Sequence, residues 1–186
     1  MVQERTRKIV ITGVLSAISI FLGMTHLGFI PWVTGASLTI MQGPVILGAV
    51  LEGPIVGFVV GLVFGIFSLI QAAVAPTGPT DVWFTNPLLS ILPRLFIGPV
   101  AWLIFRALKQ WKVPALIAAG IGGSLTNTIL VLGMIGLLGY LPWVAMPPII
   151  LANGLPEAVA SAILVVAVAS IWWQIERSGK KEGADL

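Results

Sequence analysis

Long apolar segments, broken by short turns rich in proline and glycine, make up most of this chain. No Asp, Glu, Lys or Arg occurs from Ile9 to Leu51 or from Val113 to Pro156. Each of these stretches is long enough for two membrane crossings, because a transmembrane helix needs about 20 apolar residues. The full pattern predicts six transmembrane helices, at about residues 8–25, 38–51, 54–74, 86–108, 114–138 and 149–174.

These helices predict an all-α fold, a polytopic membrane protein with a single membrane domain over residues 1–186. The composition agrees, since 58% of the residues are hydrophobic, 9% are charged and the mean hydropathy is +1.05. A soluble domain would carry roughly 25% charged residues. The segment 38–51 would span only about 21 Å as a helix. Two alternatives therefore stay open for it: the helix is longer than this segment, or it lies partly in the membrane interface.

Three clusters contain nine of the ten basic residues: Arg5, Arg7 and Lys8; Arg106, Lys109 and Lys112; and Arg177, Lys180 and Lys181. Basic residues next to membrane spans are kept on the cytoplasmic side, so the clusters predict that both termini are cytoplasmic. The net charge of +3 therefore comes from basic residues next to the membrane spans, where they attract anionic lipid. We expect no nucleic-acid partner.

The tenth basic residue, Arg94, lies about eight residues into the predicted helix 86–108, and Glu157 lies at a similar depth in 149–174. Ionisable groups at such depth are costly and by default face a polar interior. One interpretation is a structural ion pair between Arg94 and Glu157. The other is a ligand site that opens outward, in which Arg94 donates to a carboxylate or carbonyl. The two roles can coexist.

Two asparagines could join such a site. Asn153 lies one helical turn before Glu157 and would share its face, but it could instead cap a helix that starts at Gly154. Asn127 belongs to the polar stretch 124–128, and its amide needs both donors and acceptors. Interhelical hydrogen bonding and ligand contact are both open for Asn127.

Small residues spaced four apart indicate close helix packing. Gly57, Gly61 and Gly65 form one such stripe, which we interpret as a contact face between helices. Gly13 and Ala17 repeat the pattern in the first helix. That second pair could pack inside the protein or dock another membrane subunit.

Several kinds of chemistry are missing from the sequence. The chain has no cysteine, and its one histidine, His26, lies in a predicted loop, so we expect no metal site and no cofactor. It has no phosphate-binding loop of the GxxxxGK[ST] type. Nor does it pair a nucleophile with a base inside the membrane. We therefore expect that the protein is not an enzyme.

Four segments, in their order and spacing, resemble the substrate-binding (S) component of energy-coupling factor (ECF) transporters. They are the turn and glycine stripe at Ile46–Gly65, Leu-Pro-Arg at Leu92–Arg94, Ser-Leu-Thr-Asn-Thr at Ser124–Thr128, and Asn-Gly-Leu-Pro-Glu at Asn153–Glu157. With six helices and a similar length, the resemblance covers most of the chain.

The resemblance implies a multi-pass protein of the prokaryotic cell membrane that captures a vitamin or vitamin precursor from outside. Its pocket would lie among the last three helices, with the loop between the first two as a lid. The residues that would line or close it are Arg94, Asn127, Asn153, Glu157, Trp32, Thr34 and Trp83. The pattern is most similar to the pantothenate-type group, with hydroxymethylpyrimidine as another option. The chain begins Met1-Val2, without the N-terminal histidine of the metal-transporting branch.

The resemblance also implies partners, namely a transmembrane scaffold subunit and two ATPase subunits. The family docks its scaffold through a patch written AxxxA, and Gly13 and Ala17 occupy the equivalent positions here, with a departure at the first. The alternative to this importer is a self-sufficient secondary transporter in which Glu157 couples transport to protons.

Overall fold

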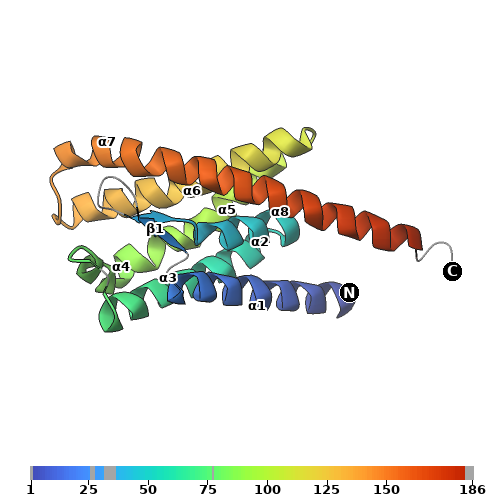
Figure 1. The fold of residues 1–186 in the computed structure, drawn as a ribbon, viewed down its shortest axis with the longest axis horizontal. Coiled ribbons are helices and arrows are strands. Elements are labelled where there is room, and N and C mark those ends of the chain that lie inside the picture. Colours follow the sequence, from blue (N-terminus) through green and yellow to red (C-terminus); the bar gives the residue numbers. More distant parts are fainter. Residues whose placement is uncertain (1, 26–27, 32–36, 77, 183–186) are drawn as a thin grey trace.

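The computed structural model describes residues 2–25, 28–31, 37–76 and 78–182. Its elements are α1 (Val2–Met24), β1 (Phe29–Pro31), β2 (Ser37–Thr39), α2 (Gln42–Glu52), α3 (Pro54–Val74), η1 (Asp81–Thr85), α4 (Pro87–Ser90), α5 (Leu92–Ala107), α6 (Lys112–Leu137), η2 (Trp143–Ala145), α7 (Met146–Ile149), the π-helical segment η3 (Ile150–Gly154) and α8 (Leu155–Glu182). The long helices lie side by side (Figure 1). The start of α1 and the end of α8 lie at one end of the bundle, and α4 and α7 lie at the other.

Five helical segments in the described residues are long and apolar enough to cross a membrane. They are Val2–Met24, Pro54–Val74, Pro87–Ala107, Lys112–Leu137 and Trp143–Ile175. The chain is therefore a polytopic helical membrane protein, as predicted. The first of these helices begins at Val2, earlier than the predicted start at residue 8.

The predicted helix at 38–51 is wrong at its start, because residues 38 and 39 belong to β2 and α2 begins at Gln42. Strand β2 pairs antiparallel with β1, so that Phe29 lies opposite Thr39. This hairpin was not predicted from the sequence. The alternation in Ser-Leu-Thr is too short to distinguish a strand from the end of an apolar helix.

Helix α2 is the buried centre of the bundle. Nine of its eleven residues are buried: Gln42, Gly43, Pro44, Val45, Ile46, Leu47, Gly48, Ala49 and Val50. It packs against α1, α3, α5, α6 and α8. A helix that is apolar on all sides must be enclosed by others. At about 16 Å, α2 is too short to cross a bilayer.

Prolines interrupt the two helices that carry the intramembrane charges. The predicted helix 86–108 is divided at Ile91 into α4 and α5, just before Pro93. The predicted helix 149–174 begins earlier, contains the π-helical segment η3 before Pro156, and continues to Glu182. A proline has no N–H for the carbonyl four residues earlier, so each break leaves a backbone carbonyl without its helical partner.

The glycine stripe of α3 lets α5 lie directly against it. A Cβ atom on Gly61 would collide with the carbonyl oxygen of Arg94. A Cβ on Gly57 would lie 2.9 Å from the Cα of Gly98, and one on Gly65 would lie 2.8 Å from the Cα of Ile91. The stripe is therefore a helix contact face, and it fixes the position of the backbone that carries Arg94.

Replacing Gly61 by alanine should destabilise the protein by about 1–3 kcal/mol, because the added methyl group has no space against α5. Gly133→Ala on α6 is the matched control, since a Cβ there meets nothing within 4 Å. The control should be as stable as the parent or more so, because alanine favours helix over glycine by about 1 kcal/mol. Thermal unfolding in detergent measures both. Equal midpoints for the two variants would contradict this packing.

Candidate ligand-binding pocket

A cavity of about 460 Å³ opens at the end of the bundle where η1, η3 and α7 lie. Its walls come from β2, α3, η1, α5, α6, η3 and α8. Apolar residues form part of the lining, among them Phe64, Trp83, Phe84, Leu132 and Ile135. Four polar residues predicted from the sequence also line it: Arg94, Asn127, Asn153 and Glu157. The structure thus brings together residues from three separate segments of the chain.

Arg94 is held in place by a carbonyl that a neighbouring proline leaves free. In a regular helix the N–H at position 93 would bond to the carbonyl of Leu89, but Pro93 has no N–H. Instead, Nη1 of Arg94 donates to the carbonyl oxygen of Leu89. The guanidinium carbon also lies 5.4 Å from the ring centre of Phe64 and 5.0 Å from that of Phe84. These contacts fix the side chain but leave its charge without a counter-ion.

The guanidinium has unused hydrogen-bonding capacity. Arg94 is only 6% exposed, and its Nε has no hydrogen-bond partner. Although both Arg94 and Glu157 are described, no salt bridge joins them. The structure therefore does not contain the ion pair that the sequence left open. A buried cation without a direct ion pair is costly, and Glu157 acts on Arg94 electrostatically but without a salt bridge, so the site is suited to an anionic ligand.

Glu157 binds the protein itself with both carboxylate oxygens. Its Oε1 accepts the backbone N–H of Thr39 at 2.7 Å, and its Oε2 accepts the hydroxyl of Thr128 at 3.4 Å. These bonds connect α8 to β2 and to α6. Thr39 could not be predicted from the side-chain pattern, because the contact uses its backbone. Glu157 therefore holds the hairpin against the pocket.

The two asparagines differ in their surroundings. Asn127 is buried, and its Oδ1 has no hydrogen-bond partner, so it offers a free acceptor beside the cavity. Asn153 lies within the π-helical segment η3, a kind of distortion that is frequent at functional sites. The helix does not begin at Gly154, so Asn153 is not the helix cap that was an open alternative.

An aromatic pair closes one side of the pocket. Trp83 in η1 lines the cavity and stacks on Tyr140, with ring centres 5.4 Å apart and an angle of 2° between the planes. Tyr140 was not predicted, since no pattern in the sequence links it to Trp83. Trp32 and Thr34, which were predicted to close the pocket, lie outside the described residues.

One further polar contact lies deeper in the bundle. Gln42 on α2 is fully buried, and its Nε2 donates to the hydroxyl oxygens of Ser124 at 2.9 Å and Ser161 at 3.3 Å. Gln42 was not predicted as a functional residue, although a glutamine within an uncharged apolar stretch is a usable signal. These bonds tie α2 to α6 and α8.

A polytopic helical membrane protein with a polar cavity at one end and an unpaired buried cation in it is suited to binding a small anionic molecule. Comparison with known proteins gives the class. The family model described as "ECF transporter, substrate-specific component" matches residues 7–169. The chain therefore belongs to this family, as the sequence motifs predicted.

Two relatives indicate which branch of the family the chain resembles. It is 28% identical over 208 residues to "Pantothenate transporter PanT" of Leuconostoc mesenteroides subsp. mesenteroides, covering 97% of this chain and 100% of that protein. It is also 28% identical over 156 residues to "Pantothenic acid transporter PanT" of Lactococcus lactis subsp. cremoris, covering 74% of this chain and 78% of that protein. These relatives fit the pantothenate-type group.

Replacing Glu157 by alanine should release the hairpin, because the N–H of Thr39 loses its charged acceptor. A hydrogen bond to a charged group contributes about 1.5–3 kcal/mol, so exchange of the Thr39 amide should be roughly tenfold faster or more. Hydrogen–deuterium exchange of the segment 37–41 measures this. Thr128→Val is the control, since it keeps the bond between Glu157 and Thr39 and removes only the Thr128 hydroxyl, which donates to Glu157 at 3.4 Å and to the carbonyl of Ser124 at 3.3 Å. Unchanged exchange in Glu157→Ala would show that the carboxylate does not hold the hairpin.

Proposed function

We propose that this protein is the substrate-binding subunit of an ECF-type ABC importer in a prokaryotic cell membrane. It captures pantothenate from outside and delivers it through a separate ATP-driven module. Membership of the substrate-specific family supports the general role. The names of the two relatives support the choice of pantothenate.

The unpaired guanidinium of Arg94 is the observation that carries the choice of ligand. Pantothenate ends in a carboxylate, and arginine binds carboxylates with charge-assisted, often bidentate, hydrogen bonds. The cavity of about 460 Å³ is within the range of about 300–1,000 Å³ for small-molecule pockets. Hydroxymethylpyrimidine, the other vitamin precursor considered, has no carboxylate and would leave this cation unpaired.

The rest of the ligand has suitable partners in the proposed site. The free Oδ1 of Asn127 can accept a hydrogen bond from an amide N–H or a hydroxyl. Asn153 and Glu157 add further polar atoms to the lining. Trp83 and Leu132 provide apolar surface for the dimethyl-substituted carbon of pantothenate. Trp32 and Thr34 would contribute from the lid.

The proposed topology has six helices, counting the short α2, with both termini cytoplasmic. The start of α1, the yellow connection between α5 and α6, and the end of α8 lie at the same end in Figure 1. All three basic clusters belong to these segments, and basic residues favour the cytoplasmic side. The pocket is at the opposite end, so this orientation opens it to the outside.

The exposed face of α1 is the proposed docking surface for the scaffold subunit, which carries the two ATPases. A Cβ on Gly13 would meet nothing within 4 Å, and Ala17 is exposed. These open surroundings of Gly13 support docking over internal packing. Small residues on an outer helix face let a second helix approach closely.

Arg94→Ala should weaken pantothenate binding by roughly 30-fold or more, because losing one partner of a buried charge pair costs about 2–5 kcal/mol. Arg106→Ala is a matched control. The guanidinium of Arg106 also lies over an aromatic ring, 4.9 Å from the centre of Trp102, but it is outside the pocket. Isothermal titration calorimetry on detergent-purified protein measures both variants. Equal dissociation constants would remove Arg94 from the site.

Gly13→Leu and Ala17→Leu should leave pantothenate binding intact and reduce assembly with the scaffold subunit, because the leucines keep the partner helix at a distance. Co-purification of the tagged scaffold measures assembly. Gly133→Leu is the control, since a Cβ at this position in α6 also meets no neighbour. Normal co-purification of both α1 variants would refute this docking surface.

A further inference from the structure

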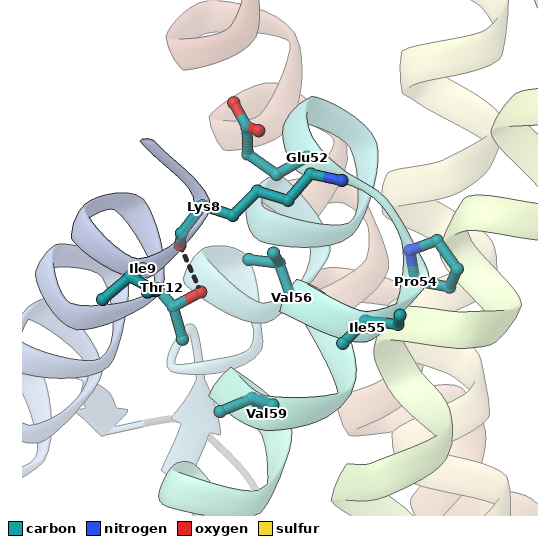
Figure 2. Close-up of a pocket in the computed structure, with 8 residues that line it drawn as sticks. All are labelled: Lys8, Ile9, Thr12, Glu52, Pro54, Ile55, Val56 and Val59. Carbon is teal, nitrogen blue, oxygen red and sulfur yellow. Dashed lines mark hydrogen bonds between the residues drawn. The ribbon is translucent and has the colours of Figure 1, made fainter. Parts of the chain in front are cut away.

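A second cavity, of about 370 Å³, lies far from the pocket, where the first turns of α1 meet the start of α3. Figure 2 shows the side chains that line this groove. Its apolar walls are Ile9 on α1 and Pro54, Ile55, Val56 and Val59 on α3. Lys8, Thr12 and Glu52 complete its lining. The groove therefore combines a continuous apolar surface with a charged rim.

The charges at the rim are not equivalent. Glu52 is neutralised, because its Oε1 lies 2.7 Å from Nε of Arg7 in a salt bridge. Within the part of the chain that the structure describes, the ammonium group of Lys8 makes no hydrogen bond or ion pair. Its side chain extends across the groove toward Pro54 (Figure 2). The hydroxyl of Thr12 is already used, donating to the carbonyl of Lys8 at 2.6 Å. The groove thus presents one unpaired cation above apolar walls.

The apolar residues that form the walls are too exposed for the groove to face water. Ile9 is 72% exposed and Ile55 is 77% exposed. Both lie on helices that can cross a membrane, next to charged residues that mark the level of the lipid headgroups. A ligand for this groove needs an apolar chain for the walls and an anionic group for Lys8. A phospholipid with a net negative headgroup has both.

We propose that this groove binds one anionic phospholipid of the surrounding membrane. The headgroup phosphate pairs with Lys8, and one acyl chain lies along Ile9, Ile55 and Val59. An acyl chain is as apolar in the bilayer as in the groove, so the hydrophobic effect gives no preference for the site. The preference comes from the charge of the headgroup and from filling the groove. Arg5, one helical turn before Lys8, adds a second positive charge on the same face.

The test uses detergent-purified, delipidated protein and native mass spectrometry, with phosphatidylglycerol and phosphatidylcholine as the two probes. The wild-type protein should retain one phosphatidylglycerol with about fivefold preference over phosphatidylcholine. Lys8→Gln should remove that preference, and Val59→Trp should fill the groove and abolish retention. The controls are Lys109→Gln, an exposed lysine between α5 and α6, and Val159→Trp, an exposed position on α8. Both controls should behave like the wild type.

Three outcomes would overturn the proposal. One is equal retention of the two lipids by the wild-type protein, and another is an unchanged preference in Lys8→Gln. The third is a Val59→Trp protein that keeps its lipid but fails to assemble with its scaffold subunit, since the groove would then belong to a protein interface. Size-exclusion chromatography and thermal unfolding check that each variant is folded. Lys8→Gln changes an exposed side chain, so it tests the proposal even where Val59→Trp fails to fold.

Discussion

The pocket depends on one backbone carbonyl that a proline releases. Pro93 cannot bond to the carbonyl of Leu89, and the guanidinium of Arg94 takes its place. Because the residue that breaks the helix directly precedes the arginine, the break and the cation are fixed together. Phe64 and Phe84 support the guanidinium with their ring faces. Glu157 acts on this charge electrostatically but forms no salt bridge with it, so an anionic ligand could make the direct ion pair that the described residues do not make.

The surrounding helices make that arrangement rigid. The backbone of α5 can approach α3 closely because Gly57, Gly61 and Gly65 carry no side chain at the contact. The short helix α2 fills the centre, and the two-stranded hairpin that directly precedes it in the chain lies at the pocket, where Thr39 is part of the lining. Glu157 then binds the backbone of that hairpin instead of pairing with Arg94. Glu157 therefore binds the protein, whereas Arg94 makes no salt bridge within the described residues and is the proposed ligand contact.

The sequence predicted the features that depend on composition and spacing. The charge-free stretches indicated a membrane protein, and the motifs around Arg94 and Glu157 indicated the family, which is confirmed. The hairpin and the Thr39 contact could not be predicted, because they depend on backbone groups and on pairing between distant segments. The stacking of Trp83 on Tyr140 likewise joins residues with no common pattern. The π-helical segment could be suspected from Pro156, but its exact form depends on packing.

The central claim is that the carboxylate of the ligand forms an ion pair with the buried guanidinium of Arg94. Calorimetric titration of the wild-type protein with pantothenate and with panthenol, in which a primary alcohol replaces the carboxylate, tests it most directly. Pantothenate should bind roughly 30-fold more tightly or better, because panthenol leaves Arg94 buried without a counter-ion. Equal affinities for the two compounds would contradict the account.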